Sequence, residues 1–205
     1  SKIVVGGPHA SFSAIEISYK YPEIDFIVFG EGEETLLKLC QSFNKPYLYS
    51  SIAGLANRQG NFFFISNMRP LIKDIDTIPL PDREGLPLKK YTRKVDGFLS
   101  TPIMTSRGCY GSCNFCDSPL FWKYPRCHSV ARVSQELHQI KNLGYTAFYA
   151  WDDIFTTNHK KLYQILDKIK KLNLIFRCNG DLRRDTKEVL QRLYDNGCRE
   201  VGFGV

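Results

Sequence analysis

The sequence predicts an α/β protein in which strands alternate with helices. Three observations predict this class: short apolar runs bounded by turn residues, apolar side chains at helical spacing after most of these runs, and 43% hydrophobic residues against 24% charged ones. The 205 residues are enough for one large domain or two small ones. Alternating units of this kind form parallel sheets, and their ligands bind beyond the carboxyl ends of the strands.

The first part of the chain is predicted to hold two strand–helix units. Residues 3–5 form a short strand, and a Gly-Gly-Pro turn at 6–8 leads into the first helix. Residues 25–29 form the next strand, and a Gly-Glu-Gly turn at 30–32 leads into the second helix. The apolar faces predicted for the two helices carry Phe12, Ile15 and Tyr19, and then Leu36, Leu37, Cys40 and Phe43.

The middle of the chain changes character. Residues 52–57 and 61–65 are predicted to form a hairpin around Arg58-Gln59-Gly60. Residues 66–97 contain four prolines and many charges without sustained periodicity, so they are predicted to form a linker. The predicted organisation is therefore a first domain over 1–65, a linker over 66–97 and a second domain over 98–205.

The second domain shows the strand–helix alternation more clearly. Strands are predicted at 103–106, 147–151, 174–178 and 200–205. Asp185 with Glu188 resembles a capping box that opens the third helix. Four such units predict part of a (β/α) barrel, whose chemistry gathers on the loops after the strands. The first two helices carry apolar stripes at Val130, Val133, Leu137, Ile140 and Leu143, and at Leu162, Ile165, Leu166, Ile169 and Leu172.

Composition and charge exclude several classes of protein. No apolar run approaches the roughly 20 residues of a membrane span, and the first residues lack the pattern of a secretory signal. These features predict a cytoplasmic protein. The chain begins and ends within predicted strands, so we expect it to be a fragment. The net charge of +7 is spread along the chain, which favours solvated faces over a nucleic-acid interface.

Three of the seven cysteines, Cys109, Cys113 and Cys116, lie in one short segment. An odd, clustered set is poor evidence for disulfides and better evidence for a metal site. Thiolates at offsets of four and three residues let one loop enclose an iron–sulfur cluster or a zinc ion. With a four-iron cluster, three cysteines leave one iron open for catalysis. With zinc, Cys127 or His128 would complete the site. The remaining cysteines, Cys40, Cys178 and Cys198, are expected to pack as small apolar residues.

The segment from Cys109 to Cys116 resembles the cluster loop of radical S-adenosylmethionine (SAM) enzymes, including the aromatic Phe115 before the last cysteine. The resemblance covers residues 98–205 and implies four strands of a six-stranded (β/α)6 TIM-like barrel. It implies a 4Fe-4S cluster on the three cysteines and SAM beside them. Phe115 would lie near the SAM adenine, and the strand end formed by Trp151, Asp152 and Asp153 would contact SAM largely through backbone atoms.

Two purely structural alternatives remain open for these residues. Phe115 is the aromatic residue between the second and third cysteines, and it would be a simple core residue if it packed inward. The second alternative concerns Asp152 and Asp153, which would only cap the helix that follows the strand.

The first part of the chain is similar to the C-terminal half of the doubly wound, Rossmann-like cobalamin-binding domain found in one branch of that family. Residues 6–11 and 30–33 carry this similarity. It implies that Gly6, Gly7 and His9 contact cobalamin. His9 follows a turn proline, and we expect it to be structural or to contact the nucleotide tail rather than to bind cobalt.

The resemblance implies reductive cleavage of SAM to a 5′-deoxyadenosyl radical. Methyl transfer, cyclisation or rearrangement on an unreactive carbon would follow. The partners implied are a small-molecule or natural-product substrate and an electron donor such as flavodoxin or ferredoxin. Two alternatives are a zinc-stabilised interaction module and a radical SAM enzyme that modifies RNA. No residue is identified as the catalytic acid or base, and the substrate is not specified by the sequence.

Overall fold

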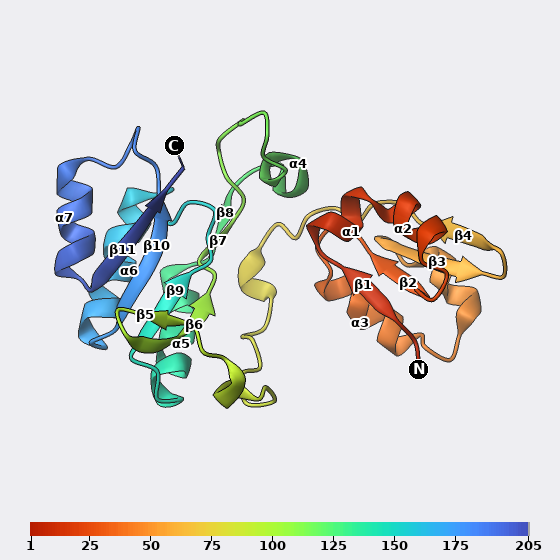
Figure 1. The fold of residues 1–205 in the computed structure, drawn as a ribbon, viewed down its shortest axis with the longest axis horizontal. Coiled ribbons are helices and arrows are strands. Elements are labelled where there is room, and N and C mark those ends of the chain that lie inside the picture. The colour runs from red at the N-terminus through yellow and green to blue at the C-terminus, as the bar shows by residue number, and fades with distance from the viewer. Residues whose placement is uncertain (205) are drawn as a thin grey trace. The chain divides into compact units, whose positions relative to one another are not determined.

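The computed structural model describes residues 1–204 and divides into two compact units, Ser1–Lys73 and Asp74–Val205 (Figure 1). Residues 74–97, which the sequence assigns to a linker, pack within the second unit. Asp76 accepts the backbone N–H of Ser129, and Arg83 forms a buried ion pair with Glu136. The functional domains over 1–65 and 98–205 stay a prediction.

The first unit is built on a four-stranded sheet in the order β1-β2-β3-β4. The first two strands are parallel, and the other neighbours are antiparallel. The predicted hairpin is confirmed as β3 and β4, with its turn at Gly60 and Asn61. The strands are Val4–Gly6, Phe26–Val28, Leu55–Gln59 and Phe62–Ile65, and the helices are α1 (Pro8–Phe12), α2 (Ala14–Lys20), α3 (Glu33–Gln41) and η1 (Pro46–Ser51).

The predicted apolar faces of the helices in this unit are wrong. The first predicted helix is interrupted at Ser13, which ends α1 and caps α2, so its apolar stripe does not continue along one face. Ala10, Ala14 and Ile17 pack against the sheet, and Phe12, Ile15 and Tyr19 are exposed. All seven predicted side chains are exposed, and the buried residues are Ala10, Ala14, Ile17 and Ser18 in α1 and α2, and Thr35 and Leu39 in α3.

The second unit contains a five-stranded, barrel-like sheet in the order β11-β10-β9-β6-β5. Strands β6 (Phe98–Ile103), β9 (Ala147–Ala150), β10 (Ile175–Gly180) and β11 (Cys198–Phe203) are parallel, and β5 (Lys94–Val95) pairs antiparallel with β6 at the edge. The main helices are α5 (Val130–Asn142), α6 (His159–Lys171) and α7 (Lys187–Asp195). The short elements are η2 (Ile75–Thr77), η3 (Leu88–Lys90), β7 (Ser106–Arg107), α4 (Ser118–Trp122) and β8 (Arg126–Cys127).

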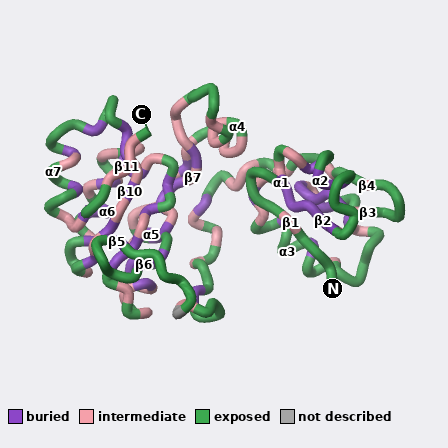
Figure 2. The backbone as a smooth tube through the Cα atoms, viewed as in Figure 1, coloured by how far each residue is buried: buried purple, intermediate pink, exposed green. Residues whose placement is uncertain are grey.

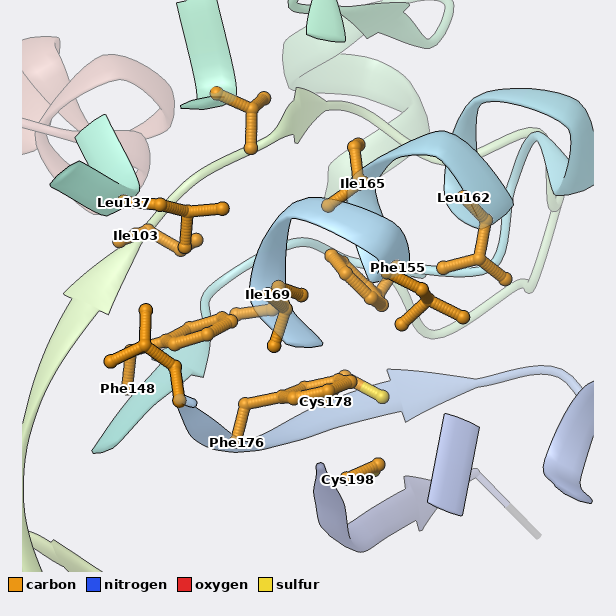
Figure 3. Close-up of a cluster of buried hydrophobic side chains, with 14 of the residues drawn as sticks. Ile103, Leu137, Phe148, Phe155, Leu162, Ile165, Ile169, Phe176, Cys178 and Cys198 are labelled. Carbon is orange, nitrogen blue, oxygen red and sulfur yellow. The ribbon is translucent and has the colours of Figure 1, made fainter. Parts of the chain in front are cut away.

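The core of the second unit lies between the sheet and its covering helices (Figures 2 and 3). Phe148 on β9 and Phe176 on β10 stack with their ring centroids 5.2 Å apart. The buried residues of α5 and α6 include Val133, Leu137 and Ile140, and Leu162, Ile165, Leu166 and Ile169. The predicted stripes of these two helices are therefore confirmed, as is the α/β class with a barrel-like sheet.

Two local predictions in the second unit are wrong. The first parallel strand, β6, ends at Ile103, where the prediction began it, because the chain turns away there and Ser106 pairs with Cys127 in a separate ribbon. The cap of α7 is Thr186, whose side chain accepts the N–H of Val189. The Asp185 carboxylate is already occupied by the hydroxyl of Thr156 and the N–H of Asp181.

Among the described residues, 1–204, none of the helices has both the length and the apolar character needed to cross a membrane.

Candidate functional site

The three clustered cysteines lie on the segment 108–125, which we call the cysteine loop. The loop rises from a two-stranded antiparallel ribbon, β7 and β8, just after the carboxyl end of β6. Ser106 pairs with Cys127 across this ribbon, and the N–H of His128 donates to the carbonyl of Thr105 at 2.9 Å. The ribbon closes the base of the loop, so the chain leaves and returns at one point of the sheet edge.

A glycine separates two of the thiols. The N–H of Gly111 donates to Sγ of Cys109 at 3.2 Å. A Cβ added to Gly111 would stand 3.3 Å from Sγ of Cys109 and 3.9 Å from Sγ of Cys113. Burial raises the pKa of the Cys109 thiol, and the negative charge of Asp153 acts in the same direction. Glycine therefore keeps the space between these two sulfur atoms clear.

The described residues, 1–204, do not bring three His, Cys, Asp or Glu side chains together in the way a single metal ion requires. Thiolates that bind separate corners of an iron–sulfur cluster lie farther apart than ligands that share one ion. Three thiols on one short loop, with Gly111 between two of them, are a donor set of the kind that holds an iron–sulfur cluster.

The two residues that would complete a zinc site, Cys127 and His128, lie at the base of the loop. Nδ1 of His128 lies 2.9 Å from Oδ1 of Asp76, and His128 is buried. Burial lowers the pKa of His128 and raises the pKa of Cys127. The His128 side chain is therefore held by Asp76 beneath the loop, and Cys127 lies next to it on β8.

Gly108 is required by the path of the chain into the loop. Its φ of 89° lies in the left-handed region. A Cβ there would stand 2.8 Å from both the Cβ of Trp122 and the carbonyl oxygen of Tyr124. The start of the loop is thus packed tightly against its own returning strand.

The carboxyl end of β9 contacts the loop through side chains. Asp152 is 1% exposed, and its Oδ1 accepts the N–H groups of Thr105 at 2.7 Å and Ser106 at 2.8 Å. Its Oδ2 accepts the hydroxyl of Thr105, and Oδ2 of Asp153 accepts the hydroxyl of Ser118 at 2.7 Å. Burial raises the pKa of Asp152 to about 6.

The helix-capping alternative for these two acids is therefore wrong. The next helix, α6, is capped by Asn158, whose side chain accepts the N–H of Lys161 at 3.1 Å. The Asp152 carboxylate instead turns back to the segment that precedes the cysteine loop.

Two predicted aromatic residues are accessible at this end of the sheet. Phe115 is 91% exposed, so the alternative that it is a core residue is wrong. Trp151 is 57% exposed, and its ring centroid lies 5.3 Å from that of Tyr149. A cavity of about 360 Å³ opens here, lined by Trp151, Asp152, Asp153 and their neighbours Arg93, Tyr149, Ala150, Arg177 and Asn179.

A further contact fixes the cysteine loop to β10, and the sequence gives no sign of it. The hydroxyl of Tyr110 donates to Oδ2 of Asp181 at 2.6 Å across 71 residues of chain. Arg183 binds the same carboxylate and keeps the pKa of Asp181 well below its usual range. Arg184 lies over the Tyr110 ring at 4.5 Å, and burial raises the pKa of Tyr110. An acid after a strand is common, so only the folded chain identifies its partner.

The glycine turns of the first unit meet at the carboxyl ends of β1 and β2. The hydroxyl of Ser11 donates to the carbonyl of Gly7 at 2.8 Å and accepts the N–H of Gly30 at 3.0 Å. Gly7 has φ of 93°, and a Cβ there would meet nothing within 4 Å. A Cβ on Gly6 would stand 3.3 Å from the carbonyl oxygen of Val28. His9 is exposed on α1. The structure thus brings Gly6, Gly7 and His9 to one open edge.

Comparison with curated proteins finds methyltransferases and cyclases. The chain is 36% identical to an uncharacterized methyltransferase of Pyrococcus horikoshii over 99% of this chain and 45% of that protein. It is 31% identical to the anaerobic magnesium-protoporphyrin IX monomethyl ester cyclase of Cereibacter sphaeroides over 98% of this chain and 34% of that protein. The chain therefore spans less than half the length of these relatives. No family model matches it.

Comparison with solved structures identifies the fold. The radical SAM methyltransferase TsrM from Kitasatospora setae, solved with tryptophan substrate and a SAM analogue, matches 99% of this chain and 41% of its own, with a TM-score of 0.76 at 20% identity. The cobalamin-dependent SAM radical enzyme OxsB, solved with aqua-cobalamin and SAM, matches 99% and 31%, with a TM-score of 0.75 at 22% identity. The chain has the fold of the matching parts of these two enzymes.

Proposed function

We propose that this chain is part of a cobalamin-dependent radical SAM enzyme. The curated relatives are named as methyltransferases and cyclases, and the two enzymes that share the fold were solved with SAM, a SAM analogue or cobalamin bound. The proposed activity is methyl transfer, cyclisation or rearrangement on an unreactive carbon of a small-molecule substrate. An electron donor such as flavodoxin or ferredoxin would serve it.

In this proposal Cys109, Cys113 and Cys116 hold a 4Fe-4S cluster. When bound, the cluster supplies through its open iron the electron that cleaves SAM to methionine and a 5′-deoxyadenosyl radical. The chain supplies the position: the β7–β8 ribbon holds the loop at the end of β6, and Gly111 leaves room between two thiols. Thiolate is the ligand that iron–sulfur clusters require.

SAM would lie over the carboxyl end of β9. The resemblance to radical SAM enzymes implies that the backbone of residues 151–153 contacts the amino group of SAM, and the Asp152 side chain is bound to Thr105 and Ser106 instead. The exposed ring of Phe115 is available to contact the adenine. The cavity of about 360 Å³ at the end of β9 provides the space and excludes part of the bulk water.

Cobalamin would bind at the open edge of the first unit. Gly7 presents bare backbone at the end of β1, which lets a large ligand approach, and Gly6 beside it lies against Val28 of β2. The exposed His9 follows directly and is placed to contact the nucleotide tail.

The observation that carries the proposal is the place of the three thiols. They stand on a loop at the carboxyl end of the first parallel strand of a barrel-like sheet, which is the edge where such folds bind their ligands. A zinc-stabilised module has no need of this edge.

Anaerobic reconstitution with iron and sulfide tests the proposal. The protein should be brown and should bleach in air, as thiolate-bound iron–sulfur centres do. Changing Cys109, Cys113 or Cys116 to Ala should remove the colour and most of the iron. Cys127→Ala and His128→Ala are the matched controls, and both variants should keep the brown colour and the iron.

The opposite result would identify the zinc-stabilised interaction module. That result is a colourless protein that holds one zinc ion and releases it when Cys127 or His128 is changed.

A further inference from the structure

The cysteine loop is tied to the sheet by three carboxylates that follow two neighbouring strands. Asp152 and Asp153 follow β9, and Asp181 follows β10. Each accepts a hydrogen bond from the loop or its base, and the loop-side partners come in chain order from Thr105 to Ser118.

The first attachment lies at the base of the loop. Asp152 accepts two backbone N–H groups and one hydroxyl from Thr105 and Ser106, and it is 1% exposed. Burying a carboxylate is costly unless it is fully hydrogen-bonded. The end of a strand does not require a buried carboxylate. The cost of burying Asp152 therefore indicates that the base of the loop must be fixed.

The other two attachments lie just after the first cysteine and just after the last one. Tyr110, next to Cys109, donates to Asp181, and Ser118, two residues after Cys116, donates to Asp153. Arg183 holds Asp181 in place from the opposite side. The loop is therefore fixed before its first cysteine, beside it, and after its last one.

We propose that Asp152, Asp153 and Asp181 are positioning residues that set the distance and orientation of the cysteine loop relative to the end of β9. This inference rests on the proposed function, because the backbone of residues 151–153 is where SAM is placed. Asp152 and Asp153 would then hold the loop or its base through their side chains and SAM through their backbone, while Asp181 would hold the loop from the neighbouring strand. The loop and the SAM position would thus be fixed to the same edge of the sheet. A shift of the loop by a fraction of an ångström would misalign SAM and the cluster.

The double variant Tyr110→Phe/Ser118→Ala tests this with little risk to folding, because each change removes one hydroxyl at the loop surface. The full-length protein that contains this chain is reconstituted anaerobically, reduced, and titrated with SAM. We expect iron content equal to wild type, SAM binding weakened about tenfold, and a smaller SAM-induced change in the electron paramagnetic resonance spectrum of the cluster. Asp167→Asn, an exposed acid on α6, is the matched control and should behave as wild type.

Asp152→Asn tests the base of the loop by the same measurements and should show the larger effect. If this variant does not fold, the double variant decides. Wild-type SAM affinity and an unchanged spectral response in the double variant would overturn the proposal. Failure of the wild-type protein to form any cluster would instead overturn the proposed function.

Discussion

The loops that follow the first strands of the two sheets are held in different ways. After β1, the Gly6–Gly7 turn is tied to the turn after β2 by a single hydroxyl, that of Ser11, and the space beside Gly7 is open. After β6, the cysteine loop has a paired ribbon at its base and three carboxylates against it. The first loop leaves backbone exposed, and the second is held by side chains.

The largest expected effect in this comparison is that of Gly108→Ala. The new Cβ would meet Trp122 and the carbonyl of Tyr124 at 2.8 Å, in a residue whose φ is already positive. Backbone strain and overpacking together should lower the free energy of unfolding by about 4 kcal/mol. Urea unfolding followed by tryptophan fluorescence measures this, since both tryptophans, Trp122 and Trp151, lie in the second unit. A loss below about 1 kcal/mol would show that the loop is not packed as described.

The second effect concerns pH and the buried Asp152. Its pKa is about 6 in the folded chain, against about 3.9 for an ordinary aspartate, so the folded state keeps a proton that the unfolded chain has released. The stabilising contribution of the protonated acid is complete below about pH 4 and is lost as pH rises through about 6. Between about pH 4 and pH 6, the free energy of unfolding of the wild type should therefore fall by about 3 kcal/mol relative to that of Asp152→Asn.

Urea unfolding of both metal-free proteins at several pH values, by tryptophan fluorescence, checks the sign and size of this effect. A difference between the two proteins that stays constant from pH 4 to about pH 7 would contradict the raised pKa.

Gly7→Ala provides the matched contrast to Gly108→Ala. Its φ of 93° is nearly the same as the 89° of Gly108, yet the added Cβ meets nothing within 4 Å. Only backbone strain remains, so the free energy of unfolding should fall by about 1 to 2 kcal/mol. Circular dichroism during urea unfolding measures it, because the first unit contains no tryptophan. An equal loss at both glycines would remove the distinction between an open and a packed loop.

The smallest effect is expected from Ser11→Ala. The change removes one hydroxyl and leaves the N–H of Gly30 without this acceptor, which should cost about 1 kcal/mol. In the full-length protein it should also reduce cobalamin retention while the iron content stays constant. Retention equal to wild type would separate the Ser11 bridge from the proposed cobalamin site.

Sequence periodicity predicts those helices whose buried faces are made of large apolar residues. The stripes of α5 and α6 repeat Leu, Ile and Val at helical spacing, and the structure buries them. Periodicity fails for α1 and α2, where Ala10, Ala14 and Ile17 are buried and the predicted residues Phe12, Ile15 and Tyr19 are exposed. An alanine is buried there because the helix packs close to the sheet. The distance between helix and sheet cannot be predicted from the sequence of the helix.

The candidate site divides in the same way. The cysteine spacing is a local pattern, so the loop is predicted from the sequence alone. The partners of Asp152 and Asp181 on the cysteine loop and at its base lie 46 to 71 residues away in the chain, and no local pattern links them. Asp185 shows the same limit, because its sequence resembles a capping box while its carboxylate binds Thr156. Long-range hydrogen bonds require the folded topology.

The contact between Tyr110 and Asp181 has a consequence for synthesis on the ribosome. It joins residues 71 positions apart, so the cysteine loop emerges well before the acid that fixes it. At about 5 to 20 residues per second the wait is about 4 to 14 s. During that time the nascent chain carries three thiols on a loop that lacks this attachment, exposed to oxidation and to stray metal ions. If the cysteines hold the proposed cluster, its site is complete only after β10 and Asp181 have been translated.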